Sequence, residues 1–276
     1  MFSIKRFILL FTAAAVAVSM ISGYAAEKRK VVIKGSTTVL PITMKGLEAF
    51  KLIKPEISIS VEGSGSGNGI KALLDGTCDI ANSSREMKKE ELDKAKAAKL
   101  KIKEIAVSYD MIVPVVHPSN KVKNLTIEQL KGIFDGTITN WKQVGGDDMN
   151  ITTVSRDSSS GTYEYWNEAV MKKADTRKDS LMQASNGAVI NTVANNRKAI
   201  GYVGFGYLDS SVKGLDVNSI QANLKNGKSF KYPVSRKLYM YVDLNKYSAD
   251  AKSFVEFLLS KNGQKIVSEA GFIPLK

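Results

Sequence analysis

The feature that most constrains the fold is a unit of strand, glycine- and hydroxyl-rich loop, and helix, which occurs three times within residues 31–98. Strands are predicted at 31–33, 57–62 and 78–81, and each is followed by small polar residues and then by a helical pattern. Alternating strands and helices predict a parallel sheet, and ligands of such sheets bind at the carboxyl ends of the strands. We therefore expect the three loops to open on the same edge.

A fourth loop of this kind lies in the second half of the chain. The sequence RDSSSGT, from Arg156 to Thr162, follows a β-branched strand at 151–154 and precedes a helix predicted over 163–173. The N–H groups and partial positive charge at a helix start bind phosphate-like anions. An arginine fork binds a tetrahedral oxyanion in two places at once. This stretch therefore predicts an anion clamp.

The rest of the chain gives simpler local predictions. Thr126 and Gln129 have the spacing of a capping box and open a helix that continues to Phe134. The other predictions are a loop at 63–69 with its helix from Ile70, a charged helix at 86–98, strands at 102–107 and 111–116 separated by Ser108-Tyr109-Asp110, a helix at 188–195, strands at 200–204 and 238–242, an irregular segment at 213–230, and a last helix capped by Ser248 or Asp250.

The N-terminus has the pattern of a secretory signal peptide. Lys5 and Arg6 precede an apolar run at 7–21, and small residues follow at Ala25 and Ala26. A membrane anchor fits less well, because a spanning helix needs about 20 apolar residues. We expect residues 1–26 to be removed on export. No cysteine lies near this cleavage point, so we expect no lipid anchor.

The length of 276 residues is enough for one large domain or two lobes, and we expect two lobes. We expect the chain to cross between the lobes near His117 and to return between Gly204 and Leu238, so that two crossings form a hinge. Lobe 1 would then contain residues 27–116 and 232–276, and lobe 2 residues 117–231.

The charge is basic but dispersed. The chain has a formal charge of +13, and removal of residues 1–26 leaves 38 basic and 27 acidic residues, a net charge of +11. Lysines alternate with acids, as on a solvated helix face, and no basic stripe is interleaved with aromatic residues. A small anion is a better match for this charge than nucleic acid. Cys78 is the only cysteine, so an intramolecular disulfide is excluded, and we expect it to be buried.

Catalysis is poorly supported. Ser160 is a nominal nucleophile, but the single histidine, His117, lies beside Pro118 at the end of an apolar strand. The loops match neither a nucleophile elbow nor a P-loop, and no residues have the spacing of metal ligands. We expect no enzyme activity, no catalytic residue, no cofactor and no metal. A phosphate-ester hydrolase remains the weaker alternative.

Six motifs occur in order along the chain: GSTTVLP at 35–41, GSGSGNGIKAL at 63–73, DIANSSR at 79–85, LTIEQLKGIFDGTITNWKQVGG at 125–146, RDSSSGT at 156–162 and IGYVG at 200–204. Together they resemble the substrate-binding proteins of bacterial phosphate ABC transporters, and the resemblance covers nearly all of the chain after residue 26. It implies a type II periplasmic-binding fold, an α/β architecture of mixed, mostly parallel sheets flanked by helices. It also implies a periplasmic receptor that captures inorganic phosphate for a membrane permease.

The resemblance also implies the ligand contacts. At Ser84 this chain departs from the best-known members, which carry an aspartate that accepts the proton of phosphate. The acceptor is left open between Asp110, Asp157, a serine oxygen and a backbone carbonyl. Sulfate carries no such proton, so a sulfate-like oxyanion remains an alternative ligand. We expect a monomer. The implied contacts are Ser36, Thr37, Thr38, Leu40, Ser66, Ser84, Arg156, Ser160, Gly161 and Thr162.

Overall fold

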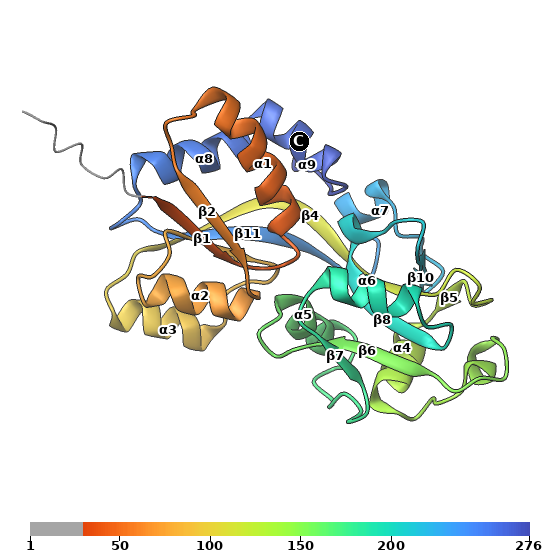
Figure 1. Cartoon of the computed structure of the whole chain (residues 1–276). Helices are drawn as coiled ribbons and strands as arrows, with labels where there is room; N and C mark the ends of the chain where they lie inside the picture. The colour runs from red at the N-terminus through yellow and green to blue at the C-terminus, as the bar shows by residue number, and fades with distance from the viewer. Residues whose placement is uncertain (1–29) are drawn as a thin grey trace, which may run out of the picture. The chain divides into compact units, whose positions relative to one another are not determined.

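The computed structural model describes residues 30–276, so the predicted signal peptide at 1–26 lies outside the described residues. Within the described part, no helix is both long enough and apolar enough to cross a membrane. Its strands form one main sheet and one two-stranded sheet (Figure 1). In the main sheet β9 (Lys213–Gly214) is attached through β4 (Ile102–Val116), and the small sheet pairs β10 (Asp216–Val217) with β5 (Asn124–Leu125).

The main sheet has the strand order β2-β1-β3-β11-β4-β8-β6-β7. Strands β1, β2 and β3 run parallel to one another, as do β6, β7 and β8, and the antiparallel strands β4 and β11 lie between the two groups. The predicted mixed, mostly parallel α/β fold is confirmed. The strands are β1 Val31–Gly35, β2 Ile59–Gly63, β3 Ile80–Ser83, β4 Ile102–Val116, β5 Asn124–Leu125, β6 Thr152–Arg156, β7 Leu181–Gln183, β8 Ala199–Gly204, β9 Lys213–Gly214, β10 Asp216–Val217 and β11 Ser235–Asp243.

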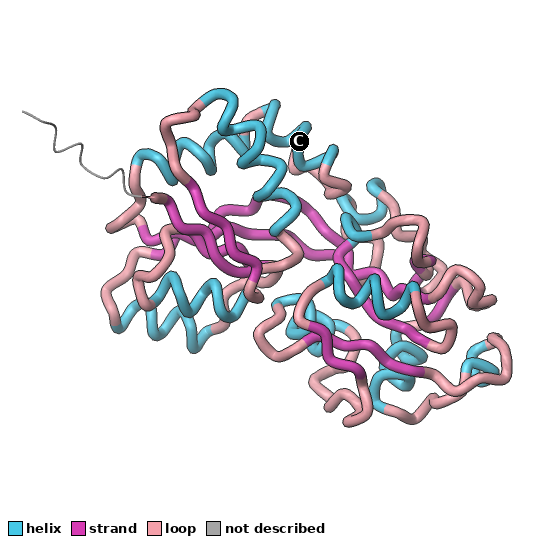
Figure 2. The backbone as a smooth tube through the Cα atoms, viewed as in Figure 1, coloured by secondary structure: helices cyan, strands magenta, loops and turns pink. Residues whose placement is uncertain are grey.

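Helices cover both faces of the sheet (Figure 2). Around β1, β2 and β3, helices α1 and α8 pack on one face and α2 and α3 on the other (Figure 1). Around β6 and β8, helix α6 packs on one face and α4 and α5 on the other. The helices are α1 Leu40–Ile53, α2 Ser66–Leu74, α3 Lys89–Ala97, α4 Ile127–Asp135, α5 Gly161–Ala169, α6 Asn186–Ala194, α7 Leu224–Lys228, α8 Ala249–Leu259 and α9 Lys261–Glu269, with 3-10 turns at Trp141–Val144 and Phe205–Tyr207.

Strand β4 corrects the prediction of two strands separated by Ser108-Tyr109-Asp110. It is one strand of 15 residues. The polar residues Ser108 and Asp110 inside an apolar run suggested a break in the strand. Both are fully buried, and both have hydrogen-bond partners. The Ser108 hydroxyl donates to the Ile273 carbonyl at 2.9 Å, and Asp110 pairs with Arg236. Tertiary partners that are distant in sequence therefore keep the strand continuous.

Strand β4 also changes partner along its length. Residues up to Met111 pair with β11, and those from Ile112 onward pair with β8. One hydrophobic core surrounds Phe254 and another surrounds Trp166. Two separate cores agree with two lobes, and the predicted boundaries at 116/117 and 231/232 stay a prediction. The core around Trp166 also contains Met111, Val116 and Tyr232.

Local backbone geometry explains most differences at element ends. Helix α2 begins at Ser66, inside the predicted loop, directly after Gly65 with φ +99°. Helix α5 ends at Ala169 rather than Lys173, because Lys172 and Lys173 have φ values of 52° and 65° that a helix cannot accommodate. Helices α7 and α9 and strands β9 and β10 were not predicted. The capping box of Thr126 with Gln129 and the cap at Ser248 are confirmed.

We expect Phe254→Ala to lower the free energy of unfolding by about 3–5 kcal/mol, because a buried phenylalanine loses its transfer energy and leaves a cavity. Phe254 is fully buried and packs edge-on against Phe50 at 5.4 Å. Urea denaturation measures the change. The control is Leu52→Ala in α1, where the side chain is 87% exposed and a change within about 0.5 kcal/mol is expected. Equal effects of the two substitutions would contradict this account of the core.

Cys78 is buried, as predicted, and burial raises the pKa of its thiol to about 12. The thiolate is the reactive form. Because the folded-state pKa is raised, the thiol stays protonated through neutral and mildly alkaline pH. A thiol reagent should therefore label the folded protein slowly and the urea-unfolded protein rapidly. Equal labelling rates in the two states would show that Cys78 is accessible.

Candidate functional site

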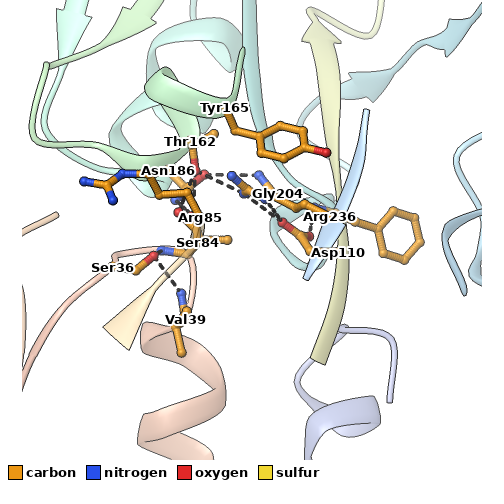
Figure 3. Close-up of polar contacts among 12 residues, drawn as sticks. Ser36, Val39, Ser84, Arg85, Asp110, Thr162, Tyr165, Asn186, Gly204 and Arg236 are labelled. Atoms are coloured by element: carbon orange, nitrogen blue, oxygen red, sulfur yellow. Dashed lines mark hydrogen bonds and ion pairs between the residues drawn. The ribbon is translucent and has the colours of Figure 1, made fainter. Parts of the chain in front are cut away.

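The loops that were predicted to share an edge meet in a chain of four hydroxyl groups. Thr38 Oγ1 lies 2.9 Å from Thr162 Oγ1, which lies 3.5 Å from Ser84 Oγ. Ser84 Oγ in turn lies 3.2 Å from Ser66 Oγ. Figure 3 shows Ser84 and Thr162. All four residues are buried. Three of them come from loops in the first half of the chain and Thr162 comes from the second half, so the cluster joins segments more than 70 residues apart.

Helix N-termini converge on these hydroxyls. Thr38 precedes α1, Ser66 begins α2, and Thr162 lies in the first turn of α5. Ser160 caps α5, where its hydroxyl accepts from Tyr163 N. The N–H groups of the first turn of a helix have no intrahelical partner, so α5 presents donors at Gly161 and Thr162. The cluster therefore lies at the positive ends of several helix dipoles.

Gly161 allows this approach. A Cβ atom placed on it would lie 2.8 Å from Ser66 Cβ and 2.8 Å from Ser84 Oγ, both closer than real Cβ contacts. A glycine at this position therefore lets α5 approach the first-half loops directly.

The loop at residues 36–40 also makes hydrogen bonds that fix the start of α1. Ser36 Oγ accepts from the N–H groups of Thr38 and Val39, and the Leu40 N–H donates to the Ser36 carbonyl at 3.2 Å. The Thr37 carbonyl accepts from Tyr207. Ser36, Thr37 and Leu40 therefore shape the start of α1, and their role as ligand contacts stays a prediction.

Arg156 is the main charge of the site. Its side chain is buried, and its Nε and Nη2 donate to the carbonyls of Gln183 and Ala184 at 2.9 Å each. Its Nη1 has no partner among the described residues, and no carboxylate there lies within ion-pair distance. Burial lowers the pKa of Arg156, whereas Asp157 raises it and Arg236 lowers it further. A buried cation in this environment is stabilised by an anion.

Arg236 is a second buried cation, which the sequence analysis missed. Its Nε and Nη2 donate to Asp110 Oδ2 at 2.9 and 2.8 Å, and Nη2 also donates to Thr162 Oγ1 at 3.1 Å (Figure 3). Like Arg156, it has an Nη1 without a partner in the described residues. Asp110 orients Arg236 toward the hydroxyl cluster, and burial raises the pKa of Asp110 while Arg236 lowers it.

Asn186 was also missed. Its amide nitrogen donates to Thr37 Oγ1 at 3.2 Å and Thr38 Oγ1 at 3.0 Å, and its oxygen accepts from Gly204 N (Figure 3). The sequence held weak signals for both residues. Asn186 lies in a loop before a predicted helix, and Arg236 is a charge at the edge of an apolar strand. Neither signal identifies a partner.

Two carboxylate groups near the site have other partners. Asp157 accepts from the backbone and the hydroxyl of Ser159 within its own loop. Glu164 in α5 pairs with Arg85 and Lys88 from the first half of the chain. These ion pairs hold the edge of the site together. Within residues 30–276, no group of histidine, cysteine and carboxylate side chains has the arrangement of a metal site.

Known proteins share both sequence and architecture with this chain. A family model described as a PBP superfamily domain matches residues 22–262. The phosphate-binding protein PstS of Borreliella burgdorferi is 36% identical over 263 residues, which are 91% of this chain and 92% of that protein. The chain belongs to the PstS family.

Solved structures agree with membership of the PstS family. A structure from Clostridium perfringens, described as a phosphate ABC transporter substrate-binding protein with bound phosphate, is 38% identical, has a TM-score of 0.85 and covers 90% of this chain and 100% of that one. An ABC-type phosphate transport receptor from Vibrio cholerae is 33% identical, with a TM-score of 0.74 and coverage of 88% and 99%. These relatives are named as binding proteins and receptors, in agreement with the expectation of no enzyme activity.

We expect Arg236→Met to lower the free energy of unfolding by about 3–5 kcal/mol, because it leaves Asp110 buried and unpaired. Adding Asp110→Asn should restore part of the loss. Burial already raises the pKa of Asp110, and loss of the cation raises it further. The deficit of the single variant should therefore shrink as the pH falls and Asp110 takes up a proton. Denaturation curves at several pH values measure this, and equal stability of the single and double variants would contradict it.

Proposed function

We propose that this PstS-family chain captures inorganic phosphate at the hydroxyl cluster and delivers it to an ABC permease. The observation that carries the proposal is the buried guanidinium of Arg156, which has no carboxylate partner among residues 30–276 and has an unpaired Nη1. A tetrahedral anion would neutralise this charge. It would also accept from Arg236, from the helix starts and from the cluster hydroxyls.

The number of donors agrees with tight binding. Each hydrogen bond to a charged acceptor contributes about 1.5–3 kcal/mol, and several together give micromolar affinity or better after the cost of association. We assign the contacts to the residues implied by the family resemblance, and we add Arg236 and Asn186, which bond to Thr162 and Thr38.

Capture requires the two halves of the chain to move. Thr38 and Thr162 lie in direct hydrogen-bond contact at 2.9 Å, so an anion must separate these hydroxyls to bind between them. We propose that the lobes, residues 27–116 with 232–276 and residues 117–231, close around the anion by bending at β4 and β11. A cavity of about 600 Å³, lined in part by Arg85, Glu164 and Arg236, borders the site and offers a route of entry.

The cellular setting follows from the same proposal. We propose that residues 1–26 direct export, that the protein acts in the periplasm as a monomer, and that both lobes contact the permease. The names of the relatives support a transport receptor. Nucleic acid is not a proposed partner.

We expect the protein lacking residues 1–26 to bind phosphate with one-to-one stoichiometry and to show no turnover of a phosphate ester. Calorimetric titration measures the first, and release of alcohol from the ester measures the second. An absence of phosphate binding would refute the proposal, and turnover lost on changing Ser160 would favour the hydrolase alternative.

Arg156→Ala should weaken phosphate binding at least tenfold, about 1.4 kcal/mol, because it removes the cation that the anion neutralises. Arg156→Lys should also weaken binding, because a lysine lacks the planar fork. The matched control is Arg197→Ala, since Arg197 is exposed and its side chain donates to the Ser119 hydroxyl, away from the hydroxyl cluster. Titration of each folded variant measures the effect, and unchanged affinity in Arg156→Ala would place the site elsewhere.

A further inference from the structure

The hydroxyl groups among the predicted contacts differ in the hydrogen bonds that they accept. There are seven, on Ser36, Thr37, Thr38, Ser66, Ser84, Ser160 and Thr162, and six of them receive a hydrogen bond from an N–H group. Ser84 Oγ does not: its partners among the described residues are the hydroxyls of Ser66 and Thr162. The N–H donors are Thr38 N and Val39 N to Ser36, Asn186 Nδ2 to Thr37 and Thr38, Ser84 N to Ser66, Tyr163 N to Ser160, and Arg236 Nη2 to Thr162.

This difference determines whether each hydroxyl is better placed to donate a hydrogen bond to the ligand or to accept one from it. A hydroxyl has one proton and two lone pairs, and accepting from an N–H group strengthens its own proton as a donor. Six hydroxyls are therefore arranged to donate to an anion. Neither lone pair of Ser84 Oγ is used by an N–H group, so Ser84 is the hydroxyl best able to accept a hydrogen bond from a protonated oxygen of the ligand.

The nearby carboxylates already accept from other groups of the protein. Asp110 accepts from two nitrogens of Arg236 through Oδ2 and from Phe205 N through Oδ1, so its charge is directed to Arg236. Asp157 accepts through Oδ1 from the backbone and the hydroxyl of Ser159 in its own loop.

We propose that Ser84 Oγ accepts a hydrogen bond from the protonated oxygen of bound hydrogen phosphate. This hydrogen bond then determines how strongly the site distinguishes phosphate from sulfate. This inference rests on the proposed function. It assigns the protonated oxygen of the ligand to the position next to Ser84, and the unprotonated oxygens to Arg156, Arg236 and the remaining hydroxyls.

A serine acceptor has a consequence that a carboxylate acceptor lacks. A carboxylate only accepts, so it repels an unprotonated oxygen, whereas a hydroxyl rotates and donates to one. The site should therefore prefer phosphate but still bind sulfate measurably. Discrimination by a hydroxyl is a difference between two hydrogen-bond arrangements rather than a charge repulsion.

The test compares Ser84→Asp with Ser66→Asp, because the two hydroxyls lie 3.2 Å apart and differ in the N–H group that Ser66 accepts. Phosphate is titrated by calorimetry, and sulfate is measured by competition. Ser84→Asp should weaken sulfate binding at least a hundredfold more than phosphate binding, which is about 2.8 kcal/mol. Ser66→Asp should weaken both ligands by similar factors, because its carboxylate would face an unprotonated oxygen.

Each other outcome overturns the inference. If phosphate affinity falls equally in Ser84→Asp and Ser66→Asp, or stays the same in both, then Ser84 does not face the protonated oxygen of the ligand. Complete exclusion of sulfate by the unsubstituted protein would indicate a carboxylate acceptor. If Ser84→Asp does not fold, Ser84→Ala replaces it and should weaken phosphate at least tenfold more than sulfate; equal losses would refute the assignment. An unsubstituted protein that binds no phosphate would instead refute the proposed function.

Discussion

The structure depends on one electrostatic constraint, a buried arginine that forms no ion pair with an acid in residues 30–276. Arg156 ends β6 and is fixed by two backbone carbonyls. An isolated buried charge is costly, and here the surrounding chain reduces that cost only in part. The second cation, Arg236, has its own partner in Asp110. The net positive charge of the site therefore remains available to a ligand, and the architecture around it serves to present donors to that ligand.

The hydrogen-bond donors of the site come from two parts of the chain, and each part has its own hydrophobic core. The first-half loops end parallel strands β1, β2 and β3, and the second-half loop follows β6. Each half has its own core, so each can keep its loops in place independently. Contact between the halves at the site is polar, and polar contacts exchange readily for contacts with an anion. The hydrophobic cores therefore lie outside the ligand site, whereas the buried Asp110–Arg236 pair inside it contributes to both stability and the site.

The repeated strand-loop-helix unit was sufficient to predict the α/β class, the shared edge of the loops and the importance of Arg156. These follow from local pattern, because strand direction brings loops together whatever the details of packing. Asp110 and Arg236 are 126 residues apart, and their pairing depends on β4 and β11 lying side by side. Local pattern contains no information on that register, so Asp110 was read as a break between strands and Arg236 was missed. Asn186 was missed for the same reason.

Strand β4 has a mechanical consequence of its own. Because it runs without interruption from one half of the sheet to the other, relative motion of the halves twists an extended strand whose backbone groups stay hydrogen-bonded. The connection between the halves through β4 is therefore a paired strand rather than an unpaired loop, and a change in their relative position must deform this strand.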